Sequence, residues 1–218
     1  MTATLDGPRW GPLEGGAVRQ LVVLCHGLGA DGHDLIDLAP GWGRAVPHAA
    51  FAAPDAPHPC DMAPMGRQWF SVADRAPARM EAGVRAAAEA LGGFVDAELA
   101  RLGLPPDAYA LMGFSQGAMT ALFAGLRRPA APRAILAYSG ALIAPETLPA
   151  ELRNRAPVLL VHGEDDDVVP VTRSRLAETA LRDSGVPVET LWCAGLGHGI
   201  DAAGIAAGGR TLQRAFSR

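Results

Sequence analysis

A serine with a glycine two residues to either side lies between a strand-like run and a helix-like run, in the sequence Gly113-Phe114-Ser115-Gln116-Gly117. A strand and a helix that meet at so sharp a turn pack closely, so side chains at positions 113 and 117 would collide. The turn pushes the Ser115 hydroxyl out above the sheet, and the N-terminus of the following helix favours negative charge beside it. The five-residue pattern alone occurs by chance, but the flanking apolar run 108–112 and helical stretch 118–128 make it specific. We therefore expect a nucleophilic serine, for which the chain must supply a base, an acid and oxyanion donors.

Length and composition exclude several classes of function. The chain has 218 residues, 49% hydrophobic and 19% charged, which suits one globular domain over residues 1–218. Its net charge of −4 argues against a nucleic-acid partner. All 19 basic residues are arginine, and without lysine neither Schiff-base chemistry nor a Walker P-loop is possible. The sequence has no apolar run of about 18 residues that would predict a membrane span, and residues 1–10 lack the pattern of a secretory signal.

The cysteines give no sign of a disulfide framework or of a metal site. Cys25, Cys60 and Cys193 are odd in number, scattered, and without metal-ligand spacing. We interpret them as structural thiols in a reducing compartment, which predicts a cytoplasmic protein with no bound metal and no cofactor.

Apolar runs alternate with helical patterns along the chain, and this alternation is typical of an α/β fold with a mostly parallel central sheet and helices on both faces. The first 19 residues, around Trp10, are predicted to form a short hairpin at the sheet edge. The predicted strands cover residues 21–25, 49–53, 108–112, 134–138, 157–161 and 188–193. The predicted helices cover residues 34–44, with an interruption at Pro40-Gly41, and residues 78–102, 118–128, 171–184 and 205–216.

A glycine-rich loop, residues 26–32, follows the first buried strand. Three glycines in such a loop let backbone N–H groups turn inward, and in α/β-hydrolases the loop at this place gives one N–H to the oxyanion hole. Leu28 is the candidate donor; the alternative is that the loop is only a flexible turn. His26 is interpreted as a structural histidine rather than a catalytic one.

Candidates for the acid and the base follow the serine in the order that α/β-hydrolases use, serine then acid then histidine. Four acidic residues, 164–167, come directly after the strand that ends at Val161. His198 stands between two glycines after the last strand, and no other histidine follows His162. A base must take the proton of the serine, and a carboxylate must hold the tautomer of the base. His198 is the candidate base, whereas His33, His48 and His58 are expected at the surface.

A long loop, residues 54–67, precedes Trp69 and Phe70 and contains Met62 and Met65. Loops of this length in compact domains are uncommon unless they serve a function. These four apolar side chains could line a pocket for an acyl chain, or they could simply cover the edge of the core. Two further candidates for the substrate pocket, on loops that follow other strands, are Leu142 and Val168.

Taken together, the motifs resemble the carboxylesterase and acyl-protein thioesterase family of α/β-hydrolases, and the 62–70 segment is closest to its bacterial carboxylesterase branch. The segments that carry the resemblance, in chain order, are 26–32, Pro54-Asp55-Ala56-Pro57, Trp69-Phe70, 113–117, 162–170 and Gly197-His198. The resemblance implies a single domain with no large cap and a triad of Ser115, His198 and an aspartate within 164–167. It also implies that the backbone N–H groups of Leu28 and Gln116 form the oxyanion hole, and it suggests a homodimer.

The family pattern also bears on which acid belongs to the triad. In that pattern the aspartate lies four residues after the histidine of His-Gly and four before the proline. Counting from His162 and back from Pro170 selects Asp166 both times. Asp167 stands where family members often carry another residue and is the second candidate; Asp165 is the third.

The expected function is that of a serine carboxylesterase that hydrolyses short- to medium-chain esters, or thioesters, through an acyl-enzyme. A lysophospholipase or an acyl-protein thioesterase would use the same chemistry and remains an alternative. A catalytically silent binding protein with the same fold is a third possibility, although such proteins usually lack one member of the triad. The expected partner is a small ester or acyl substrate.

Overall fold

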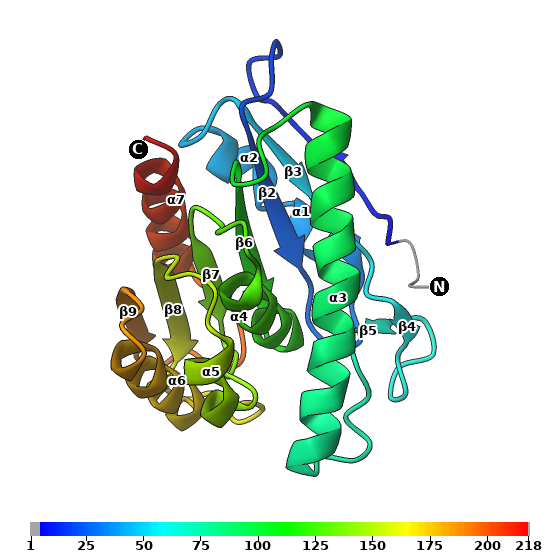
Figure 1. The fold of residues 1–218 in the computed structure, drawn as a ribbon, viewed down its shortest axis with the longest axis vertical. Helices are drawn as coiled ribbons and strands as arrows, with labels where there is room; N and C mark the ends of the chain where they lie inside the picture. Colours follow the sequence, from blue (N-terminus) through cyan, green and yellow to red (C-terminus); the bar gives the residue numbers. More distant parts are fainter. Residues whose placement is uncertain (1–4, 218) are drawn as a thin grey trace.

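A seven-stranded sheet forms the centre of the computed structural model, which describes residues 5–217 (Figure 1). The strand order is β1-β3-β2-β6-β7-β8-β9; neighbours are parallel except β1, which runs antiparallel to β3. The strands are β1 (Arg9–Trp10), β2 (Gln20–Cys25), β3 (Ala49–Ala52), β6 (Tyr109–Phe114), β7 (Ile135–Tyr138), β8 (Val158–Gly163) and β9 (Val188–Cys193). The mostly parallel α/β arrangement predicted from the sequence is confirmed.

Helices cover both faces of this sheet, as the alternating pattern predicted (Figure 1). One face packs against α3 (Pro77–Leu102), α4 (Gln116–Arg127) and α6 (Thr172–Asp183); the other packs against α1 (Gly32–Ile36), α2 (Ala39–Gly43) and α7 (Ala202–Phe216). A 3-10 turn, Pro145–Thr147, and the short helix α5 (Leu148–Glu151) follow β7. None of the helices within residues 5–217 combines the length and the apolar composition that a membrane crossing needs.

The continuous apolar strands arise because both faces of the sheet are buried. In β2, Leu21 and Val23 join the core under α3 and α4, whereas Val22 and Leu24 join the core on the opposite face. This alternation is the two-residue period of a strand. A parallel sheet brings the carboxyl ends of its strands to one edge, so the loops that follow β2, β6, β8 and β9 meet there.

Three local predictions need correction. The N-terminal segment forms no hairpin within the described residues: β1 pairs with β3 instead, and the Trp10 ring packs edge-on against Phe51 with 5.8 Å between ring centroids. The interruption predicted in the helix 34–44 lies at residues 37–38, between α1 and α2, whereas Pro40 and Gly41 are inside α2. The long loop 54–67 is partly structured, because β4 (His58–Pro59) pairs antiparallel with β5 (Arg67–Gln68).

Candidate active site

Ser115 occupies a strained turn between β6 and α4. Its backbone has φ 53° and ψ −117°, a positive φ that a residue with a side chain rarely adopts. The turn is held by Ser115 N–H, which donates to the Tyr138 carbonyl oxygen at 2.8 Å. A Cβ on Gly113 would overlap the backbone of Gly117, and a Cβ on Gly117 would overlap the carbonyl of Cys25. The two glycines are therefore required by close packing, as the sequence pattern predicted.

His198 lies on the loop after β9 with its ring between the serine and an acid. Its Nε2 is 3.0 Å from Ser115 Oγ, and its Nδ1 is 2.7 Å from Asp166 Oδ2. The ring packs against Phe114, with 4.8 Å between ring centroids. Since Nδ1–H donates to a carboxylate, Nε2 carries the lone pair that faces the hydroxyl of Ser115.

Asp166 is the buried member of the acidic run. Its Oδ1 accepts the backbone N–H groups of Val168 at 3.0 Å and Val169 at 2.8 Å. Burial acts to raise the pKa of Asp166, but the hydrogen bonds from His198 and from Val169 N–H outweigh it and hold the pKa below its usual range. The other acids of the run, 164, 165 and 167, are exposed, and Glu164 pairs with Arg175. Only Asp166 within this run contacts His198.

A second histidine contacts the same carboxylate. His162, fully buried at the end of β8, places Nε2 at 3.1 Å from Asp166 Oδ2 and at 2.7 Å from the Val169 carbonyl oxygen. Two acceptors face Nε2, so this nitrogen carries the hydrogen. Its Nδ1 is 2.7 Å from Ser174 Oγ. Burial lowers the pKa of His162, which favours a neutral ring. The one hydrogen of the Ser174 hydroxyl then faces two acceptors, this Nδ1 and the Gly140 carbonyl oxygen at 3.1 Å. The sequence pattern predicted no role for His162 beyond its place in the His-Gly motif.

The glycine-rich loop after β2 lies directly beside the serine. A Cβ placed on Gly27 would be 3.5 Å from Ser115 Cβ. Within residues 5–217, neither Leu28 N–H nor Gln116 N–H donates to a protein acceptor, and both residues border the same pocket as Ser115. Two inward N–H groups beside a serine hydroxyl are the arrangement of an oxyanion hole.

Buried hydrogen bonds hold this loop in place. His26 Nε2 accepts Ala56 N–H at 2.9 Å, so its Nδ1–H donates to the Gly27 carbonyl oxygen at 2.7 Å. The indole N–H of Trp69 donates to the His26 carbonyl oxygen at 2.9 Å. The structural role predicted for His26 is confirmed: its ring is buried and contacts only backbone groups through its nitrogens.

The Gln116 side chain joins the same buried network. Its Oε1 accepts Trp69 N–H at 2.8 Å, and its Nε2 donates to the Phe70 carbonyl oxygen at 2.7 Å. Both polar atoms of the carboxamide are therefore occupied behind the site, whereas the backbone N–H of Gln116 has no protein acceptor among the described residues.

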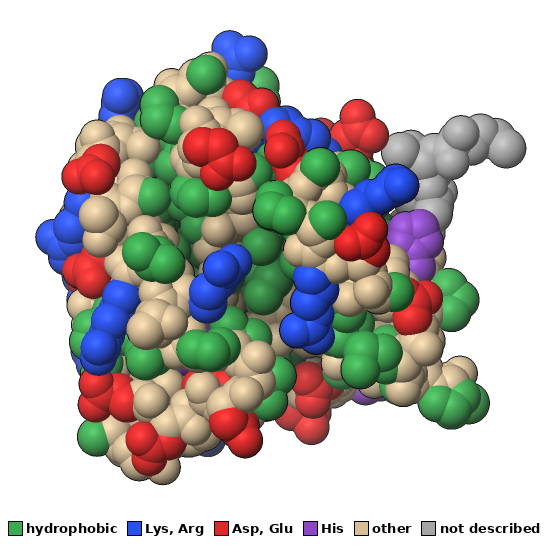
Figure 2. Space-filling view, turned by 90° about the horizontal axis from the view of Figure 1, so that it is seen from below, with side chains coloured by type: hydrophobic (Ala, Val, Ile, Leu, Met, Phe, Trp, Pro, Cys, Tyr) green, Lys and Arg blue, Asp and Glu red, His purple; other side chains and the backbone are tan. Residues whose placement is uncertain are grey.

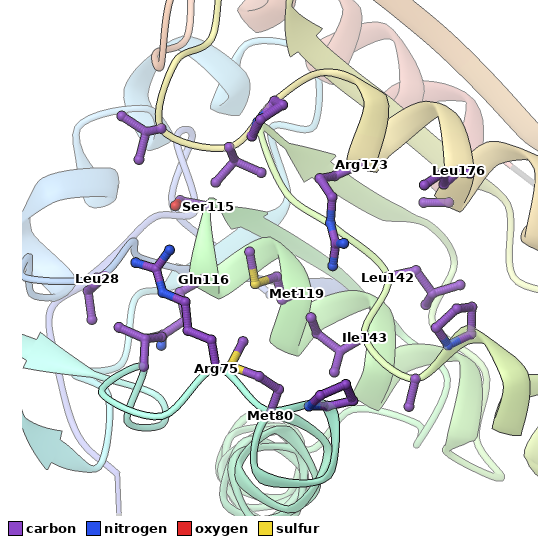
Figure 3. A pocket seen from close by; sticks show the side chains of 18 of the residues that line it. Leu28, Arg75, Met80, Ser115, Gln116, Met119, Leu142, Ile143, Arg173 and Leu176 are labelled. Carbon is purple, nitrogen blue, oxygen red and sulfur yellow. The ribbon is translucent and has the colours of Figure 1, made fainter.

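A cavity of about 540 Å³ opens beside Ser115 (Figure 3). Leu142 and Val168 border it, as predicted. Its other apolar walls come from Leu28, Val72, Met80, Met119, Ile143 and Leu176. Sequence reasoning missed most of these. The place of Met119 could have been predicted from its spacing, because it stands one helical turn after Ser115 and so lies on the same face of α4.

The prediction that the segment 62–70 lines the cavity is wrong. Met62 and Met65 lie between β4 and β5 and point into solvent, with 71% and 92% of their surfaces exposed. Trp69 and Phe70 are buried in the core under α3. The alternative interpretation, that these aromatic residues cover the edge of the core, describes them correctly.

The described residues contain no group of three or more histidine, cysteine, aspartate or glutamate side chains arranged to hold a metal ion. The cysteines that are described are free thiols buried in the core, and burial raises the pKa of the Cys25 thiol far above its usual value.

Comparison with known proteins places this geometry in a family. The family model described as phospholipase/carboxylesterase matches residues 14–210. The chain is 33% identical to acyl-protein thioesterase 1 of Schizosaccharomyces pombe, over 68% of this chain and 69% of that protein. It is 28% identical to esterase YpfH of Escherichia coli, over 84% and 77%. The crystal structure of esterase PE8 superposes with a TM-score of 0.92 at 41% identity, covering 98% of this chain and all of that one. The chain therefore belongs to the phospholipase/carboxylesterase family of α/β-hydrolases and is a serine hydrolase.

Proposed function

We propose that the protein hydrolyses short- to medium-chain carboxylic esters, with Ser115 as nucleophile, His198 as base and Asp166 as triad acid. The observation that carries the proposal is the continuous chain of hydrogen bonds from Ser115 Oγ to His198 Nε2, 3.0 Å, and from His198 Nδ1 to Asp166, 2.7 Å.

The reaction follows from the position of each group. Ser115 Oγ attacks the acyl carbonyl carbon as His198 Nε2 takes its proton, and Asp166 stabilises the imidazolium that forms. The carbonyl oxygen becomes an oxyanion, which accepts hydrogen bonds from the N–H groups of Leu28 and Gln116. Collapse of the intermediate expels the alcohol, to which His198 returns the proton. A water molecule then repeats these steps on the acyl-enzyme and releases the acid.

The cavity supports the substrate class. Its volume of about 540 Å³ lies in the range of small-molecule sites, and its walls are mostly apolar. An acyl chain that replaces water there gains about 0.8 kcal/mol per buried methylene. A short or medium chain matches this space.

A covalent probe tests the proposal. A fluorophosphonate should label the protein at Ser115, and Ser115→Ala should abolish both labelling and hydrolysis of 4-nitrophenyl esters while the protein stays folded. A protein that neither labels nor turns over esters of two to twelve carbons would be a silent binding protein, and the proposal would fail.

A thioesterase activity is the second candidate, favoured by relatives named acyl-protein thioesterase 1 in two fungi. The same attack serves a thioester, whose leaving group is a thiolate. Measuring the turnover of oxygen esters and thioesters with the same acyl chains shows which of the two activities is greater. A lysophospholipid tested in the same assay addresses the remaining alternative.

Three sequence predictions remain predictions. These are the single domain over residues 1–218, a cytoplasmic location and a homodimer. The last is measured most directly by light scattering coupled to gel filtration.

A further inference from the structure

Two arginines border the cavity beside Ser115. Arg75 lies two residues before α3 begins, and Arg173 is the second residue of α6. Figure 3 shows their side chains on either side of the apolar walls formed by Met119 and Ile143. Both residues are exposed, so their charged ends lie towards the mouth of the cavity. Figure 2 shows basic side chains flanking a hollow with hydrophobic walls on this end of the molecule.

Neither arginine has an acidic partner within the protein. Their neighbours in sequence do: Arg79 pairs with Asp74 at 3.8 Å, and Arg175 pairs with Glu164 at 2.8 Å. Across residues 5–217, no carboxylate oxygen lies within 4.0 Å of a side-chain nitrogen of Arg75 or Arg173. Glu146, which also borders the cavity, is paired with neither. The bordering side chains thus carry two positive charges against one negative charge, in a protein whose net charge is −4.

Local structure gives no reason for these positive charges. A cation near the first turn of a helix is unfavourable, because that end of the helix already carries partial positive charge. The first turns of α3 and α6 contain no acidic residue, and neither helix has a side-chain hydrogen bond at its N-cap. The two arginines therefore add to an existing positive field at the cavity mouth.

We propose that the cavity selects esters whose acyl chain ends in a carboxylate, that is, half-esters of dicarboxylic acids. This inference rests on the proposed function and specifies its substrate. The apolar walls accommodate the methylene chain, and the planar guanidinium groups meet the terminal carboxylate, to which they can donate two parallel hydrogen bonds. Because both arginines are exposed, the carboxylate keeps part of its hydration and the cost of removing it from water stays small.

A ratio of specificity constants tests this assignment. The substrates are 4-nitrophenyl butyrate and mono-4-nitrophenyl glutarate, which share a leaving group and differ mainly in a terminal carboxylate. The wild-type protein should favour the glutarate. An exposed ion pair is worth up to about a fivefold change in an equilibrium constant. We expect Arg75→Gln and Arg173→Gln each to lower the glutarate-to-butyrate ratio roughly two- to fivefold, and the double variant about tenfold. A change common to both esters cancels in the ratio.

The matched control is Arg79→Gln, an exposed arginine that follows Arg75 closely but does not border the cavity. It should leave the ratio as in the wild-type protein. Raising the salt concentration should lower the wild-type ratio and have little effect on that of the double variant.

The outcomes separate the two proposals. If neither ester is hydrolysed, the proposed function fails. If both are hydrolysed but the double variant keeps the wild-type ratio, the carboxylate assignment is overturned. A ratio that favours a phosphonate-ended ester, with no arginine-dependent preference for the glutarate, would also overturn it and would assign the arginines to a phosphate-like group.

Discussion

The same dipeptide, His-Gly, stands at the carboxyl ends of two strands: His26-Gly27 directly follows β2, and His162-Gly163 ends β8. The two histidines make different contacts. Both rings are fully buried, and burial lowers the pKa of each. The nitrogens of His26 contact only backbone groups, the Gly27 carbonyl and Ala56 N–H, and so fix the path of the loop that carries Leu28. His162 instead donates its Nε2–H to the Val169 carbonyl and places the same nitrogen 3.1 Å from the Asp166 carboxylate.

The difference shows that a His-Gly motif after a strand can position either the backbone of its loop or a charged side chain. The loop after β2 must present an N–H group, so its histidine secures backbone geometry. The loop after β8 must present an ionised acid in a buried place, where Asp166 accepts hydrogen bonds from His198, Val168 and Val169. The ring of His162 packs against this carboxylate and holds the Val169 carbonyl. Hydrogen bonds to a charged group are worth about 1.5–3 kcal/mol, against about 1 kcal/mol for neutral pairs. Loss of His162 should therefore act on catalysis, and loss of His26 mainly on stability.

The largest decrease in kcat should come from removing the negative charge of Asp166. Asp166→Asn removes the group that fixes the tautomer of His198 and should lower kcat by at least about 10² and by up to about 10⁴. Asp167→Asn is the matched control, because Asp167 is adjacent but exposed, and it should keep most activity. Both variants are measured on one chromogenic ester. A larger loss in Asp167→Asn would mean that the triad acid is misassigned by one residue.

The paired histidine variants test the comparison directly. His162→Gln removes the imidazole that lies 3.1 Å from the Asp166 carboxylate and should lower kcat about tenfold with little change in KM, since 1.4 kcal/mol is a factor of ten. His26→Gln should lower the free energy of unfolding by about 1–3 kcal/mol while kcat falls less. Steady-state kinetics and urea denaturation of both proteins provide the measurement. Equal effects of the two variants on kcat would remove the distinction between the loops.

Like His26, the Gln116 side chain holds backbone groups in place and does not contact Asp166. Gln116→Ala keeps the oxyanion N–H but leaves Trp69 N–H and the Phe70 carbonyl without their buried partners. We expect a loss of about 2 kcal/mol in the free energy of unfolding and only a few-fold change in kcat. Loss of a true oxyanion donor costs about 10²–10³ in kcat. A decrease that large in a folded variant would show that the side chain itself acts in catalysis.

The smallest expected effect is a decrease in stability at acidic pH. The folded protein resists protonation of His26 and His162, whereas the unfolded chain protonates them near pH 6.5. The unfolded state therefore binds more protons as pH falls, and the free energy of unfolding should decrease between pH 7.5 and about 5. Protonation of His26 would break its bond to Ala56 N–H, so His26→Gln should flatten this decrease. His58→Gln, at an exposed position, should leave it unchanged.

Asp166 acts in a separate pH range. Because its pKa is held below the usual value, its contribution to stability is complete above about pH 4 and is lost only as pH falls further. Urea titrations at four pH values between 7.5 and 5 thus report on the histidines and not on Asp166.

Much of this architecture was predictable because it depends on local patterns. Apolar runs locate the buried strands, and Gly113 and Gly117 mark the elbow because no larger residue fits there. The order of serine, acid and histidine selected His198, and counting in the family pattern selected Asp166; these two side chains are hydrogen-bonded in sequence with Ser115. The role of His162 was not predictable, because its contacts depend on where the chain goes after β8 and brings Val169 and Ser174 against the ring.

The substrate cavity was the least predictable region. Its walls come from four separate loops and three helices, α3, α4 and α6, and no period in the sequence connects them. Composition drew attention to Met62 and Met65, which the β4–β5 hairpin carries into solvent. Trp69 was a reasonable candidate by size, but its N–H groups are bonded to His26 and Gln116 in the core.

The close packing at Gly113 and Gly117 has a consequence for how such an enzyme can change over evolutionary time. Each glycine excludes a methyl group because of backbone atoms, which no compensating side-chain substitution can move aside. Substitution of either glycine in the elbow is therefore not tolerated. The rim residues Val72, Arg75, Arg173 and Leu176 face open space, and replacements there meet little steric resistance. Lineages that share this elbow can therefore diverge in substrate specificity while the bond-breaking step stays the same. A protein engineer can change the same rim residues.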